Sequence, residues 1–257
     1  MPGWLVLAGL LSVQTALSWA GQAERVRFAG LDFVAYWVDL ESDELSLCWR
    51  DAAGKQLGTF TRLSEHLAAR SKELKFAINA GIYSREGAPV GLHVEDGRTL
   101  RPLNLGDGES GQWNFYLKPN GVFYVAEGKP GIAESAQFAK LELRPSLACQ
   151  SGPLLVSDGK IHPAFQPDSK NLHWRSGVGV TRDGRLVFAI SKQALRFYDF
   201  ARLFKEPLRC DHALYLDGDI CAIYLPEFGH RADDTSTRFA GMFAVTAKPK
   251  AGPPSPK

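Results

Sequence analysis

The sequence lacks any long run of one charge. Its 257 residues carry 30 Lys and Arg against 28 Asp and Glu, a formal net charge of only +2. A protein that binds nucleic acid through its phosphates needs a basic patch or stripe, so no nucleic-acid partner is expected. Internal repeats and internal linkers are also missing, which favours one globular domain over a repeat array or a string of domains.

Cysteines are few, and none forms a CxxC pair. The chain has four of them, Cys48, Cys149, Cys210 and Cys221. Their spacing matches no common zinc motif, and Cys210 with His212 is a weak signal, so we expect neither a metal site nor a cofactor. A bound divalent cation stays open. So does the cysteine state: disulfides, including one between Cys210 and Cys221, and buried free thiols both fit the count.

Charge is also missing from the N-terminus, where no charged side chain occurs between Trp4 and Ala20. Ser18 and Ala20 suit the −3 and −1 positions of a signal-peptidase site. We therefore expect a signal peptide at 1–20, with cleavage possible as far as residue 23. The rival interpretation, a membrane anchor, is less favoured because about 17 uncharged residues are short for a spanning helix. Cleavage predicts a periplasmic or secreted protein with no stable membrane span.

Short apolar runs separated by turn residues dominate the rest of the chain. This rhythm, with a few helical patterns, predicts a single α+β domain over 24–247 with a mixed, strand-dominated central sheet. A Pro-rich, disordered tail is expected at 248–257. Hairpin turns are expected at Gly30, Asp96-Gly97, Pro119-Asn120-Gly121 and Asp183-Gly184. Helices are expected within 59–71, where Ser64 is a plausible cap, within 134–143 and within 197–208.

One apolar run ends in two carboxylates around a glycine. The stretch "DHALYLDGDICAIYLP" (211–226) leads into Asp217-Gly218-Asp219. A tight hairpin turn is one interpretation, because Asp-Gly is common turn chemistry. The other is a catalytic acid at the end of a strand buried on both faces, since "ALYLD" is apolar on both sides. A carboxyl in that place is partly desolvated, which suits a general acid.

Polar residues stand at other strand ends as well. In "FAINAGIYS", Asn79 closes an apolar run and Gly81 allows a close backbone approach. An Asn there can hold a sugar hydroxyl or simply stabilise the turn. Arg175 precedes a strand with alternating glycines and is suited to bidentate capture of phosphate or carboxylate, or to packing over apolar neighbours. A serine triad through Ser151 is disfavoured, because "CQSGP" lacks the GxSxG elbow.

Taken together, these segments resemble the phosphodiester glycosidase family, in its bacterial, exported, single-domain branch. The resemblance runs from Phe76 to Val245. It is carried by "NAG" (79–81), "PVGLHVEDG" (89–97), "NFYLKPNGVF" (114–123), "QSGPLLVSDGKIHP" (150–163), "RSGVGVTRDGRLVFAIS" (175–191) and "YLDGD" (215–219). It implies a hydrolase that cleaves sugar, such as N-acetylglucosamine, from a phosphodiester, with a carbohydrate or sugar phosphate as its partner.

The resemblance also implies roles for individual residues. Asp217 would act at the anomeric carbon as general acid/base or nucleophile, Arg175 would bind phosphate oxygens, and Asn79 would hold the sugar. The expected substrate-binding residues are Gly81, Lys118, His162, Gly218 and Asp219. Glycoside cleavage usually takes two carboxylates, and Asp219, Asp199 and Glu95 are the candidates for the second.

One departure from the family pattern keeps an alternative open. The family loop reads "NLDGGGS", whereas this chain has "YLDGDIC", with Asp219, Ile220 and Cys221 in place of small residues. This difference favours a non-catalytic module that binds glycans or a protein in the same pocket. A thiol-dependent activity at Cys221 is a third, weaker hypothesis.

Overall fold

The computed structural model describes residues 21–108, 114–218, 220–230 and 238–248. The predicted signal peptide, Asp219 and nearly all of the predicted tail lie outside these ranges. Among the described residues, no helix is long and apolar enough to cross a membrane.

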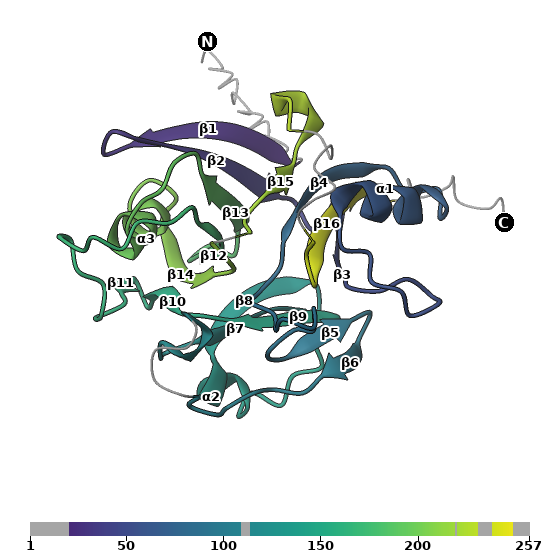
Figure 1. Cartoon of the computed structure of the whole chain (residues 1–257), viewed down its shortest axis with the longest axis horizontal. Coiled ribbons are helices and arrows are strands. Elements are labelled where there is room, and N and C mark those ends of the chain that lie inside the picture. The colour runs from purple at the N-terminus through teal and green to yellow at the C-terminus, as the bar shows by residue number, and fades with distance from the viewer. Residues whose placement is uncertain (1–20, 109–113, 219, 231–237, 249–257) are drawn as a thin grey trace, which may run out of the picture.

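The strands form three sheets, and every strand pair within the described residues is antiparallel (Figure 1). The seven-stranded sheet has the order β1 (Gln22–Phe28), β2 (Leu31–Val38), β13 (Leu186–Ser191), β12 (Ser176–Thr181), β14 (Cys210–Tyr215), β10 (Leu154–Ser157), β11 (Lys160–Ile161). The four-stranded sheet has the order β15 (Ile223–Tyr224), β4 (Leu74–Asn79), β16 (Met242–Ala247), β3 (Asp43–Cys48). The five-stranded sheet has the order β6 (Arg98–Arg101), β5 (His93–Glu95), β9 (Leu147–Ser151), β7 (Gly121–Ala126), β8 (Lys129–Glu134).

The strand-dominated α+β fold in one domain is confirmed, with the helices α1 (Phe60–Ala68), α2 (Ser135–Phe138) and α3 (Phe197–Lys205). The predicted single mixed sheet is corrected to three antiparallel sheets. Short turns account for the hairpin pairs β1–β2, β5–β6, β7–β8, β10–β11 and β12–β13, whereas the pairing of strands far apart in the sequence is decided by the tertiary structure.

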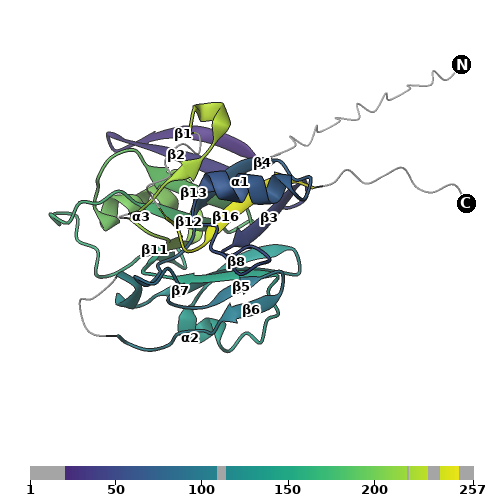
Figure 2. The same ribbon diagram turned by 45° about the vertical axis from the view of Figure 1, so that its right-hand side comes forward.

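One hydrophobic core is shared by all three sheets. Phe188 of β13, Phe243 of β16 and Phe123 of β7 come from different sheets and are almost fully buried. Their ring centroids lie 5.1 to 5.9 Å apart. Figure 2 shows the five-stranded sheet as a layer beneath the other two, closing this core from below. Because the sheets bury their inner faces against one another, the described chain forms a single folding unit.

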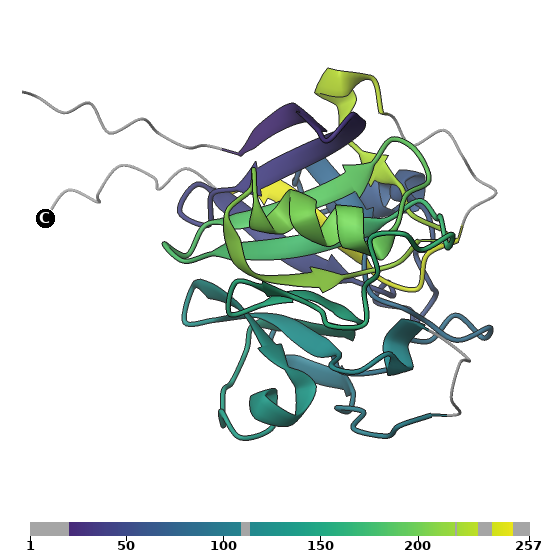
Figure 3. The ribbon, with the colours of Figure 1, turned by 90° about the vertical axis from the view of Figure 1, so that its left-hand side faces the viewer.

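Helix α3 covers the outer face of the seven-stranded sheet (Figure 3). The alternating glycines of β12 make room for it. A Cβ at Gly179 would lie 2.6 Å from the Phe204 ring, and one at Gly177 would lie 3.1 Å from Phe200 and Phe204. The aromatic side chains of α3 fill the space beside these glycines, so this space is not open to a ligand.

The predicted turns at Gly30, Asp96-Gly97 and Asp183-Gly184 are confirmed as hairpins. The prediction of a hairpin at Pro119-Asn120-Gly121 is wrong, because β7 begins at Gly121 and pairs with β8. Residues Asn114–Tyr116 form a short 3-10 turn instead. Asn120 closes this segment, since its Nδ2 donates to the carbonyl of Phe115 at 2.9 Å. Buried Phe115 therefore anchors a folded-back loop and not a strand.

Within the described residues, none of the four cysteines forms a disulfide. Cys210 is buried in the core between α3 and the seven-stranded sheet, and Cys149 is buried in β9. The disulfide considered between Cys210 and Cys221 is therefore not formed in this structure. Burial raises the pKa of Cys149 to about 12, and burial likewise raises the pKa of Cys210. These two thiols are neutral near pH 7 and act as small apolar residues.

Helix α1 begins one residue after its cap, Thr59, whose Oγ1 accepts from the backbone N–H of Arg62 at 3.2 Å. Ser64, the cap proposed from the sequence, lies inside the helix. We expect Thr59→Ala to lower the free energy of unfolding by about 1 kcal/mol, because one helix donor loses its acceptor. Ser64→Ala is the matched control and should change it by less than about 0.5 kcal/mol. Urea unfolding curves measure both; equal losses in the two variants would contradict the assignment of the cap.

Candidate active site

Asp217 lies where the chain leaves one sheet for another. It follows β14, which pairs with β12 on one side and β10 on the other. The next strand, β15, belongs to the four-stranded sheet. Asp217-Gly218 is therefore not a hairpin turn, and the strand-end interpretation is the one that the structure supports. As predicted, the preceding strand is buried on both faces, with Leu214 and Tyr215 at most 1% exposed.

Ser176 joins the Asn79 and Asp217 segments. Its Oγ accepts from Asn79 Nδ2 at 2.9 Å and donates to the carbonyl of Asp217 at 2.8 Å. The backbone N–H of Ser176 donates to the same carbonyl at 2.9 Å. The ends of β4 and β14 and the start of β12 therefore meet at one point, although they are far apart in the sequence.

The Asn79 side chain is buried and bonded within the protein. Its Oδ1 accepts from the N–H of Ala222 at 3.2 Å, and its Nδ2 bonds to Ser176 and to the Ala80 carbonyl. These contacts tie both sides of the loop around Asp217 to β4. In this structure Asn79 orders the loop, and direct contact with a sugar stays a prediction.

Asp217 is a partly buried residue, and its Oδ1 accepts from the N–H of Gly218 at 2.6 Å. Position 218 has no room for a side chain. A Cβ there would lie 2.1 Å from Tyr215 Oη and 2.6 Å from the carbonyl oxygen of Trp174. Glycine therefore lets the loop pack against these two residues, which holds the carboxylate in place.

Arg175 lies on the α3 side, away from Asn79. Its side chain is fully buried, and the guanidinium carbon stands 3.5 Å from the centre of the Phe197 ring. Its Nε donates to the carbonyl of Leu195 at 2.9 Å. Because the guanidinium is buried, a phosphate in solvent does not reach it in the present conformation. The structure therefore gives no support to the predicted role of Arg175 in phosphate binding. The contacts instead attach the chain before β12 to the start of α3.

Gly81 makes the predicted close approach, but to the protein itself. A Cβ there would lie 2.8 Å from the Gln150 carbonyl oxygen and 2.9 Å from Ser151 Cβ. Ser151 in turn donates from its Oγ to the carbonyl of Leu216 at 2.9 Å. Strand β9 therefore packs against the segment that leads to Asp217, and the Ser151 hydroxyl is used in a hydrogen bond to that segment.

No described contact brings His162 or Lys118 to Asp217. His162 is buried, its ring stacks on Phe165 at 4.7 Å, and its Nδ1 accepts from the N–H of Ala164. Burial lowers its pKa, and the Lys118 backbone opposes this shift. His162 lines a separate cavity of about 260 Å³. Lys118 forms an exposed ion pair with Asp107.

The predicted second carboxylates have other partners. Asp199 pairs with Arg196 at 2.9 Å, and Glu95 pairs with His93 at 2.7 Å. Asp219 lies outside the described residues. Within the described part of the chain, no group of three or more His, Cys, Asp or Glu side chains is placed to hold a metal ion.

Three residues near Asp217 were missed by the sequence analysis: Ser176, Tyr83 and Trp174. Burial, and after it the Asp217 charge, raises the pKa of Tyr83 to about 12. Its hydroxyl donates to the Arg238 carbonyl at 2.7 Å. Tyr83 and Ser176 each lie within four residues of a predicted site residue, which is the signal that could have suggested them.

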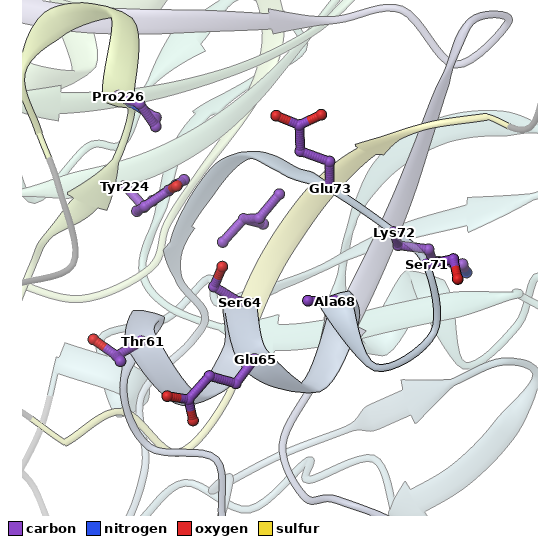
Figure 4. A pocket seen from close by; sticks show the side chains of 10 residues that line it. Thr61, Ser64, Glu65, Ala68, Ser71, Lys72, Glu73, Tyr224 and Pro226 are labelled. Carbon is purple, nitrogen blue, oxygen red and sulfur yellow. The ribbon is translucent and has the colours of Figure 1, made fainter.

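A cavity of about 680 Å³ lies away from Asp217, which is not among its lining residues. It separates α1 from β15 and the turn Pro226–Phe228, and Figure 4 shows Ser64 and Tyr224 among its lining side chains. It contains none of the predicted site residues.

Comparisons with known proteins agree with this architecture. The phosphodiester glycosidase family matches residues 72–220, more than half of the chain. The chain therefore belongs to the phosphodiester glycosidase family, which confirms the resemblance in its motifs. A curated relative, "Uncharacterized protein YigE" of Escherichia coli (strain K12), is 38% identical over 191 residues, which cover 74% of this chain and 73% of the relative.

Two solved structures share the fold. The first is the catalytic domain of zebrafish N-acetylglucosamine-1-phosphodiester alpha-N-acetylglucosaminidase, auto-inhibited by its pro-peptide; its TM-score is 0.59 at 14% identity, covering 90% of this chain and 83% of that one. The second is a hypothetical protein from Synechocystis, with a TM-score of 0.52 at 16% identity, covering 89% and 62%. At these identities the likeness establishes the fold alone.

Proposed function

We propose that the protein is an exported hydrolase of a glycosyl phosphodiester, or of a related glycosidic linkage, in the bacterial envelope. Family membership supports the reaction class. The observation that carries the proposal is the Asp217 carboxylate, which stands at the junction held together by Ser176. The uncharged N-terminal segment before Glu24 motivates the proposed export.

The proposed reaction adds water across the bond between the anomeric carbon and the phosphate oxygen. The carbon gains the hydroxyl of water, the C–O bond breaks, and the phosphate leaves as a monoester that retains the bonding electron pair. Asp217 acts at the anomeric carbon, either as the base that takes the proton of water or as a nucleophile that water later displaces. Phosphate is a good leaving group, so a strong acid to protonate it is not essential.

A substrate panel tests the proposal. Purified protein is incubated with N-acetylglucosamine-1-phosphate diesters, UDP-N-acetylglucosamine and aryl α-glycosides, and free sugar and phosphate monoester are quantified. We expect a diester to release the two products in equal amounts, and aryl glycosides to react far more slowly. Binding without turnover would contradict the proposal and favour the non-catalytic glycan- or protein-binding module. Release from aryl glycosides alone would indicate an ordinary glycosidase.

A further inference from the structure

An exposed aromatic residue stands directly before Arg175. Trp174 is 48% exposed, and Leu172, two positions earlier, is 52% exposed. Trp174 is the only aromatic residue among the large hydrophobic residues exposed in the described ranges. Single exposed apolar residues are common on protein surfaces, so its position has to decide whether it has a role.

Trp174 borders the loop that carries Asp217. Its carbonyl oxygen lies 2.6 Å from the point that a Cβ of Gly218 would occupy. Two residues further along, the N–H of Ser176 donates to the Asp217 carbonyl. The backbone that bears the indole and the backbone that bears the carboxylate are therefore packed against each other.

The backbone on both sides of Trp174 is held in place. His173 and Leu195 exchange two backbone hydrogen bonds, of 3.2 and 2.9 Å. The N–H of Arg175 donates to Ser191 Oγ at 2.9 Å, and the buried Arg175 side chain adds its bond to Leu195. The backbone at Trp174 is therefore already ordered, and a Trp side chain has only two torsions to fix when a ligand covers it, which favours binding.

We propose that Trp174 is a specificity-determining residue that stacks on a pyranose ring of the substrate, with Leu172 extending the apolar surface. This inference rests on the proposed function. A pyranose presents a flat face of C–H groups, which fits the large apolar face of an indole. The polar rim of the same sugar would face the carboxylate of Asp217. The ligand is therefore a glycan, bound face-on at the edge of the candidate active site.

Sugar binding, turnover and stability are measured in three variants. N-acetylglucosamine 1-phosphate is titrated calorimetrically into wild type, Trp174→Ala, Trp174→Phe and Leu141→Ala, an exposed apolar control on another segment. Loss of the apolar face of the indole is expected to raise the Kd about tenfold in Trp174→Ala, which corresponds to about 1.4 kcal/mol. We expect KM for a diester to rise by a similar factor, kcat to stay within about twofold, and the unfolding temperature to be unchanged. Trp174→Phe should retain most of the affinity, and Leu141→Ala all of it.

The readouts separate failure of this inference from failure of the proposed function. If the wild type shows no turnover but still binds the sugar phosphate through Trp174, the proposed hydrolase activity is overturned and the stacking role of Trp174 is supported. Unchanged Kd and KM in Trp174→Ala overturn the stacking role and leave the hydrolase standing. A loss of unfolding temperature and kcat with unchanged Kd would show that Trp174 is merely structural. A wild type that binds no sugar phosphate overturns the inference as well.

Discussion

Asp217→Asn is expected to stop sugar release while the protein stays folded. The amide cannot take a proton from water or attack the anomeric carbon, and acid–base groups of this kind contribute about 10² to 10⁴ in rate. We therefore expect kcat for a diester to fall about a thousandfold. Asn keeps an oxygen that can accept from the N–H of Gly218, so the loop should hold its shape. Sugar release and a urea unfolding curve, recorded on the same preparation, check both halves of the prediction.

Asp211→Asn provides the matched control. Asp211 lies on the same strand, β14, but pairs with exposed Arg182 at 2.8 Å. Its loss should leave kcat within about twofold and stability within about 0.5 kcal/mol. If Asp217→Asn kept more than a tenth of the wild-type rate, the role assigned to this carboxylate would be wrong, whatever the family.

Arg175→Lys is expected to lower the free energy of unfolding by about 3 kcal/mol. A lysine has no planar guanidinium to stack on Phe197, where a desolvated cation–π contact is worth about 2 kcal/mol. It also loses the fixed Nε–H bond to the Leu195 carbonyl, and a hydrogen bond from a charged group is worth about 1.5 to 3 kcal/mol. The unfolding midpoint in urea measures the loss, and Arg175→Met serves as a second, uncharged variant.

The same variant distinguishes two roles for Arg175. As a positioning residue it should reduce stability and kcat together, because the chain before β12 loosens beside Asp217. A phosphate-binding role would instead raise KM for the diester and leave stability nearly unchanged. Arg185→Lys is the control: Arg185 also stacks on an aromatic ring, 4.9 Å from Trp37, but is partly exposed and should cost less than about 1 kcal/mol. If Arg175→Lys were as stable as the wild type, the proposal that buried Arg175 attaches the chain before β12 to the start of α3 would be contradicted.

Local chemistry explains which parts of the fold could be predicted from the sequence. The hairpins at Gly30 and Asp183-Gly184 depend on turn residues and on adjacent strands, so a short window of sequence contains the signal. The Pro119-Asn120-Gly121 segment also consists of residues that favour turns, but it forms no hairpin. It folds back because Asn120 bonds to the Phe115 carbonyl and Phe115 enters the core. Burial of that ring depends on the rest of the molecule.

The sequence by itself determined the strand-rich single domain and the family, and it pointed to Asn79, Arg175 and Asp217, since motifs and apolar alternation are properties of neighbouring residues. Only the tertiary structure decided that the strands divide into three antiparallel sheets, that the β12 glycines admit α3, and that Arg175 is buried while Trp174 is exposed. These outcomes depend on which surfaces pack together. Packing joins residues such as Asn79 and Ser176, 97 positions apart, and no local pattern contains that contact.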